Sequence, residues 1–187
     1  MISYPERPLS LLFRRTVSPF PHPNVRLGER IDIALPKLNP ETGQPLSLLP
    51  CPFSTVLFGE ECDLRPDQPG SVLLAGTQYV VKPGDGAILV MMLVRRRGDF
   101  THQDFRERWL NGHARFGLQT AASGYRQLHS GEEPAPDGFD GAGLVFFRDL
   151  DHVANARAAP EIAREATRDE MQFIDHSRSM LAMFRLD

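Results

Sequence analysis

The 187-residue chain has few cysteines and no long apolar run, and each shortage excludes a class of protein. Its two cysteines, Cys51 and Cys62, are too few for a disulfide framework and lack the spacing of a zinc site. The longest apolar run, residues 87–94, is far shorter than the roughly 20 residues that cross a bilayer. The N-terminal residues lack the early positive charge and the apolar stretch of a signal peptide. We therefore expect a cytoplasmic protein with no membrane partner.

Basic charge and metal-binding or nucleotide-binding motifs are also lacking. Lysine and arginine total 21 against 24 acidic residues, so the net charge of −3 gives no electrostatic case for binding nucleic acid. The six histidines show no metal-ligand spacing. There is no GxGxxG, P-loop, GxSxG or HExxH motif, which argues against nucleotide-binding enzymes, serine hydrolases and zinc proteases of the zincin type. We expect no bound metal and no cofactor.

Proline is scarce only in the second part of the chain, because 13 of the 16 prolines lie at or before Pro83. Proline interrupts helices, so residues 1–86 are expected to form strands and loops. Apolar, β-prone runs at residues 9–13, 55–58 and 72–81 are the expected strands. The KPGDG cluster at residues 82–86 is the expected boundary between two halves.

The second half, residues 87–187, alternates strand-like and helix-like segments. Residues 87–94 are apolar without alternation, which predicts a strand buried on both faces. Thr101 and Asp104 have the spacing of a capping box, so a helix should begin there and end near Ser123.

Strands at residues 125–129 and 143–147 should follow that helix. Asp149 or Asp151 should begin a second helix, and Pro160 should interrupt it. A further helical stretch to about Asp175 then precedes a strand at residues 180–184. The resulting βαββαβ order is that of a ferredoxin-like α+β fold.

Five short motifs in this half resemble the EthD family. They are Gly98-Asp99-Phe100, Phe105-x3-Trp109-x3-His113, Gly124-Tyr125-Arg126-Gln127-Leu128-His129, Phe139-Asp140-Gly141 and Asp169-Glu170-x2-Phe173. The resemblance covers about residues 87–187. It implies an α+β barrel in which two ferredoxin-like antiparallel sheets pack face to face, usually from two subunits.

Residues 1–86 resemble a degenerate copy of the second half. The segment near residue 9 parallels that near 88, the one near 53 parallels that near 139, and the one near 77 parallels that near 179. If these parallels reflect duplication, the barrel forms inside one chain as a pseudo-dimer. The alternatives are a strand-rich extension of unrelated origin and a barrel formed by a homodimer.

His113 is the candidate catalytic residue, because an imidazole on an amphipathic helix can transfer a proton near neutral pH, and its position in the family motif agrees. The alternative is a partly buried structural histidine. Phe105 and Trp109 lie on the same helical stripe, where aromatic residues either form core or contact a ligand. Phe173 is expected to line the same pocket.

Strand alternation places Tyr125, Gln127 and His129 on one face, which we expect to contact a small-molecule ligand. Asp140 is a further candidate ligand contact. Asp169 and Glu170 could orient an imidazole, but exposed helix charges explain them more simply. The arginine run at residues 95–97 is interpreted as a strand end in solvent.

The resemblance implies an enzyme that oxidises or dehydrates a hydrophobic aromatic or polyketide-like molecule without a cofactor, with His113 transferring a proton. One alternative is a non-catalytic protein that binds such a molecule or assists an oxygenase. Another is a haem-dependent or flavin-dependent monooxygenase, because neither group needs a recognisable motif in this fold.

Overall fold

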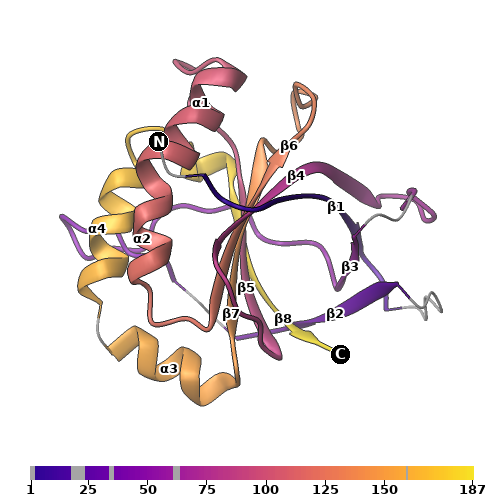
Figure 1. The fold of residues 1–187 in the computed structure, drawn as a ribbon, viewed down its shortest axis with the longest axis horizontal. Helices are drawn as coiled ribbons and strands as arrows, with labels where there is room; N and C mark the ends of the chain where they lie inside the picture. The colour runs from indigo at the N-terminus through magenta and orange to yellow at the C-terminus, as the bar shows by residue number, and fades with distance from the viewer. Residues whose placement is uncertain (1–2, 18–23, 34–35, 61–63, 159) are drawn as a thin grey trace.

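The computed structural model describes residues 3–17, 24–33, 36–60, 64–158 and 160–187, so His22 and Cys62 lie outside the described residues. Eight antiparallel strands close into a barrel, and the helices pack along one side of it (Figure 1). The strands are β1 (Glu6–Arg14), β2 (Val25–Ile31), β3 (Thr55–Gly59), β4 (Val72–Lys82), β5 (Ile88–Val94), β6 (Gly124–Ser130), β7 (Gly141–Phe147) and β8 (Met180–Leu186). The helical segments are α1 (His102–Arg108), the π-helical turn η1 (Trp109–His113), α2 (Ala114–Gln119), α3 (Leu150–Ala158), α4 (Glu161–Glu170) and the 3-10 turn η2 (His176–Arg178).

The barrel closes within this one chain, in the order β1-β3-β2-β8-β5-β7-β6-β4. Each half contributes four adjacent strands. Numbered within its own half, each set has the order 4-1-3-2, which in the second half accompanies the predicted βαββαβ succession. The two sets join where β2 pairs with β8 and where β4 pairs with β6.

The three pairs of segments with similar sequences lie on equivalent strands of the two halves, namely β1 with β5, β3 with β7, and β4 with β8. The fourth pair, β2 with β6, had no sequence signal, and β2 was not predicted. Its sequence VRLGERI carries a glycine and three charges, so it lacks the apolar run that marks a strand. The common strand order supports a degenerate ferredoxin-like repeat in residues 1–86, which stays a prediction.

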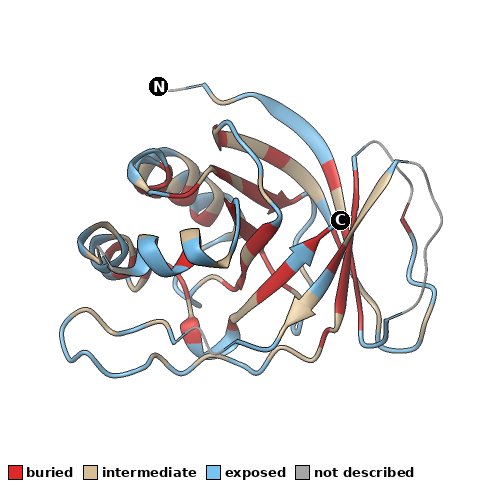
Figure 2. Cartoon of the chain, turned by 90° about the horizontal axis from the view of Figure 1, so that it is seen from below, coloured by how far each residue is buried: buried red, intermediate tan, exposed pale blue. Residues whose placement is uncertain are grey.

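The two faces of β5 explain its unbroken apolar sequence. Leu89, Met91 and Leu93 belong to the cluster that fills the barrel, together with buried side chains of six other strands. Met92 and Val94 point to the opposite face, where they pack under the helices. The strand is therefore buried on both sides, as predicted. Figure 2 shows the same arrangement, with buried residues concentrated on the strands and on the inner sides of the helices.

The first helix begins as predicted, because the Thr101 hydroxyl accepts a hydrogen bond from the Asp104 backbone N–H. The prediction that this helix ends near Ser123 was wrong. The helix passes through the π-helical turn η1 and ends at Gln119, after which Thr120 is extended. Pro160 separates α3 from α4 as predicted. No helix in the described part of the chain is long and apolar enough to span a membrane.

Candidate functional site

The π-helical turn η1 places His113 at the junction between α1 and α2. In this turn the Ala114 N–H reaches back five residues to the carbonyl of Trp109. Such single π-helical turns interrupt α-helices frequently at functional sites. His113 is the last residue of the turn and is only 5% exposed.

Two carboxylates from the end of α4 flank the imidazole of His113. Its Nδ1 lies 2.9 Å from Asp169 Oδ2, and its Nε2 lies 3.6 Å from Glu170 Oε1. An ionised carboxylate only accepts hydrogen bonds, so the Nδ1 atom carries a hydrogen and donates a hydrogen bond to Asp169. This bond fixes the orientation of the ring, as carboxylate partners of functional histidines do.

Cationic side chains neutralise both carboxylates. The Arg108 guanidinium binds Asp169, while the Lys37 ammonium lies 2.7 Å from Glu170. His176 Nε2 lies 3.3 Å from the same Glu170 carboxylate. We refer to these six residues, Lys37, Arg108, His113, Asp169, Glu170 and His176, as the His113 cluster. Lys37 belongs to the first half of the chain, so both halves build this cluster.

The pKa values of the two carboxyl groups are lowered, because the cluster stabilises their ionised forms. Burial would raise the pKa of Glu170, but the Lys37 ammonium, the hydrogen bond from His176 and the neighbouring His113 together lower it to about 2. Burial also opposes ionisation of Asp169, yet its hydrogen bonds with His113 and Arg108 lower its pKa. Both groups are therefore ionised at neutral pH.

The prediction that Asp169 and Glu170 are exposed helix charges was wrong, since each is only 8% exposed. The last turn of α4 lies against α2 and η1, so consecutive carboxylates can reach both sides of one imidazole. The motif Asp169-Glu170-x2-Phe173 was the sequence feature that indicated a role for these two carboxylates. Nothing in the sequence indicated Lys37, because it lies more than a hundred residues from its partner.

Phe105, Trp109 and Phe173 form a packed aromatic cluster between the sheet and the helices. The ring centroids of Phe105 lie 5.5 Å from Trp109 and 5.7 Å from Phe173, and all three residues are almost fully buried. Phe173 also contacts the His113 ring edge-on, with centroids 5.5 Å apart. The structure thus brings Phe173 into contact with His113 and packs Phe105 between Phe173 and Trp109. Contact of these three residues with a ligand stays a prediction.

Tyr125, Gln127 and His129 share the face of β6 that lies under the helices, as predicted. The Gln127 amide donates to the Tyr125 hydroxyl over 3.1 Å and to the Trp109 carbonyl over 3.4 Å. Its oxygen lies 3.0 Å from His129 Nε2. The His129 ring stacks on Trp109, with centroids 4.6 Å apart. Leu128 points the other way, into the barrel.

We refer to Tyr125, Gln127 and His129 as the row on β6. Burial is the main cause of the pKa shifts of its two titratable groups, Tyr125 and His129. It raises the pKa of the Tyr125 hydroxyl, which is therefore neutral at physiological pH. It lowers the pKa of His129 to about 3, and the positive charges of Arg106 and His102 add to that effect. The row consists of neutral hydrogen-bonding groups, in contrast to the charged His113 cluster.

Gly117 allows α2 to lie against the Tyr125 ring. A Cβ atom at this glycine would fall 1.9 Å from a ring carbon of Tyr125. Gly117→Ala is therefore expected to lower the free energy of unfolding by about 1–3 kcal/mol, measured by urea denaturation. Gly98→Ala is the control, because a Cβ there meets nothing within 4 Å. Equal stability of the two variants would show that α2 does not pack this closely on β6.

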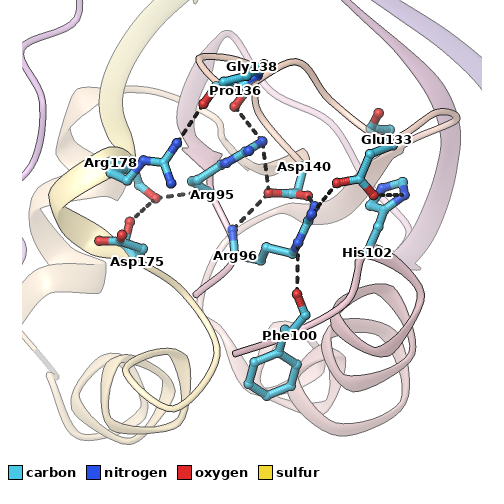
Figure 3. A network of polar contacts seen from close by, with 12 residues as sticks. Arg95, Arg96, Phe100, His102, Glu133, Pro136, Gly138, Asp140, Asp175 and Arg178 are labelled. Atoms are coloured by element: carbon cyan, nitrogen blue, oxygen red, sulfur yellow. Dashed lines mark hydrogen bonds and ion pairs between the residues drawn. The ribbon is translucent and has the colours of Figure 1, made fainter. Parts of the chain in front are cut away.

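Asp140 lies in a separate ionic network at the end of β5 (Figure 3). The Asp140 carboxylate is fully buried, accepts a hydrogen bond from the Arg96 backbone N–H over 2.9 Å and pairs with the side chains of Arg96 and Arg95. The prediction of a basic strand end in solvent was wrong for Arg95 and Arg96, because the loop before β7 covers them and supplies their counter-charge. Arg97 is exposed, with Asp99 as its partner. These bonds occupy Asp140 with two guanidinium groups.

Metal binding has no evident centre among the residues that the structure describes. No group of three or more histidine, cysteine, aspartate or glutamate side chains is arranged there to hold an ion. The candidate site therefore consists of the His113 cluster, the aromatic cluster beside it and the neutral row on β6.

Comparisons with known proteins support the fold and the resemblance of residues 97–177. A search of curated protein sequences found no match. A crystal structure described as "putative monooxygenase from Lactobacillus acidophilus NCFM" is similar over 96% of this chain and 94% of that one, with a TM-score of 0.50 and 5% sequence identity. At this identity the likeness concerns the fold alone. Residues 97–177 match the family model of the EthD domain, which confirms the resemblance for that segment.

Proposed function

Taking the EthD domain of residues 97–177 as the premise, we propose that this protein is an enzyme acting on a hydrophobic aromatic or polyketide-like molecule. It oxidises or dehydrates that molecule without a cofactor, and His113 transfers the proton. The observation that carries the proposal is the 2.9 Å hydrogen bond between His113 Nδ1 and Asp169. It orients the ring and leaves Nε2 as the atom that exchanges a proton with substrate.

The surroundings of His113 suit an apolar substrate. The rings of Phe116 and Phe173 lie 5.4 and 5.5 Å from the imidazole, and Glu170 faces its Nε2. When Nε2 takes a proton, the resulting imidazolium keeps its hydrogen bond to Asp169 and lies 3.6 Å from Glu170, so both negative charges stabilise it. The same two carboxylates that position the base therefore stabilise the state formed by proton transfer.

Both reactions begin with removal of a proton from substrate carbon by Nε2. In the oxidation, dioxygen is the oxidant, and a methylene group between two aromatic rings plus one O2 gives a ketone and one water. In the dehydration, a hydroxyl group on the neighbouring carbon leaves with a returned proton as water, and a carbon–carbon double bond forms. Neither balance requires another reactant.

A non-catalytic small-molecule-binding or accessory role is the second candidate function. His113 is nearly inaccessible, and each flanking carboxylate already has a cationic partner. A purely structural ion cluster would have the same features. In that case the protein binds the hydrophobic molecule without converting it.

Turnover of a diaryl methylene compound separates the two roles. With anthrone as the probe, the wild-type protein should accelerate oxygen consumption and form the ketone, detected by mass spectrometry. His113→Gln should lower kcat by about a hundredfold, because general acid–base residues contribute at least that much. His152→Gln is the matched control, since His152 lies on α3 and hydrogen-bonds backbone groups, the Arg148 N–H and the Ala121 carbonyl. Full activity of His113→Gln would remove the proton-transfer role.

A further inference from the structure

A surface pocket lies where β4 and β6 meet α1 and η1, apart from the His113 cluster. Its lining includes Tyr79, Arg106, Leu110, Asn111 and His129, and His113 is not part of it. The pocket has a volume of about 210 Å³, so it is small and suits a small ligand. His129 is the only one of these five residues that is fully buried, at 1% exposure.

The hydrogen bonds of Gln127 determine which nitrogen of His129 carries the proton. The Trp109 carbonyl can only accept, so the Gln127 NH2 group must face it. The Gln127 oxygen is thereby directed at His129 Nε2, 3.0 Å away, and that nitrogen must donate. In the neutral ring the other nitrogen, Nδ1, then holds a lone pair. No residue that the structure describes donates a hydrogen bond to it.

His129 is thus a hydrogen-bond acceptor in the pocket and not a proton acceptor. Burial lowers its pKa to about 3, so the ring stays neutral over the physiological range. A ligand group that satisfies Nδ1 must itself carry a hydrogen. Stacking on Trp109 at an interplanar angle of 4° holds the ring in place for such a group.

The remaining lining favours a flat ring with a partly negative oxygen. Tyr79 packs edge-on against His129 with centroids 4.9 Å apart, and Leu110 adds an apolar side chain. The Arg106 guanidinium makes no hydrogen bond or ion pair with another described residue, so it can face a ligand oxygen. Glu107 also lines the pocket, where it accepts a hydrogen bond from Gln103.

We propose that this pocket binds a phenol, whose hydroxyl donates a hydrogen bond to Nδ1 of His129 while its ring packs against Tyr79 and Leu110. Arg106 stabilises the phenol oxygen. Binding here requires no turnover and does not involve His113, so the proposal stands or fails independently of the proposed reaction.

The single tryptophan of the chain reports on this pocket, because Trp109 stacks on His129. Titration with 4-methylphenol should change Trp109 fluorescence and give a dissociation constant at least tenfold lower than that of 4-methylanisole, which has no hydrogen to donate. His129→Phe should abolish that preference, measured by titration calorimetry because the change alters the neighbour of Trp109. His152→Phe should retain it. Equal affinity of the wild-type protein for the two probes, or a preference that survives His129→Phe, would overturn the proposal.

Nitrogen-15 NMR of labelled histidine tests the premise in the unaltered protein. The His129 signals should show a protonated Nε2 and an unprotonated Nδ1, and the Nδ1 signal should move on addition of 4-methylphenol but not of 4-methylanisole. A proton on Nδ1, or an Nδ1 signal that 4-methylphenol leaves unmoved, would refute the assignment.

Discussion

Replacing Asp140 by alanine is expected to lower the free energy of unfolding by about 3–5 kcal/mol, because it leaves buried charge uncompensated. Asp140 has no exposed surface, and the side chains of its partners Arg95 and Arg96 are only 9% and 15% exposed. The carboxylate also accepts a hydrogen bond from the Arg96 backbone N–H. The alanine variant loses all of these bonds while the arginines keep their charge.

Asp99→Ala is the matched control for this substitution. Asp99 pairs with the neighbouring Arg97, but the two side chains are 60% and 47% exposed, so solvent screens their attraction. We expect this variant to stay within about 0.5 kcal/mol of the wild type. Urea denaturation at neutral pH measures both changes. Comparable stabilities for the two variants would show that the Asp140 network is open to water.

Acid is expected to weaken the protein through Glu170. The pKa of this carboxyl group falls from its ordinary value of 4.5 to about 2 on folding, because the Lys37 ammonium, His176 and His113 outweigh the effect of burial. A lowered pKa of an acid stabilises the folded state above the unfolded value, and this contribution is lost as pH falls from about 4.5 through about 2. Its size is about 3 kcal/mol, from 1.36 kcal/mol for each pKa unit.

The variant Glu170→Gln isolates this contribution. At pH 7 it should be less stable than the wild type by about 3 kcal/mol, and the difference should shrink as the pH falls from 5 to 2.5. Glu161→Gln at the exposed start of the same helix should keep a small, constant difference. Chemical denaturation across this pH range gives the curves. A difference between wild type and Glu170→Gln that does not change with pH would exclude a strongly paired Glu170.

The first half of the chain contributes more than four strands of the barrel. Lys37 neutralises Glu170, which lies beside His113 at the end of α4. Glu41 pairs with Arg168, also on α4. The EthD match ends at residue 177 and begins at residue 97, so it includes neither of these partners from the first half. The candidate site therefore depends on residues outside the matched domain.

Several features could be predicted from the sequence because neighbouring residues determine them. Thr101 caps the helix that it precedes, since donor and acceptor are three residues apart. Pro160 ends α3 because it cannot continue the helical hydrogen bonds. The side chains of Tyr125 and His129 could be placed on one face of β6, because side chains alternate between the two faces along a strand.

Other features depended on residues that meet only in the folded chain. From the sequence alone, a charged residue is predicted to be exposed unless its partner is known. The partners of Glu170 and Asp140 lie on distant segments of the chain. Strand β2 had no apolar signal of its own and is held by pairing with β3 and β8. The sequence by itself determined the second half's succession of strands and helices, and the resemblance drew attention to His113. Only the tertiary structure decided which charges are buried, because burying a charge is favourable only where an opposite charge is brought to meet it.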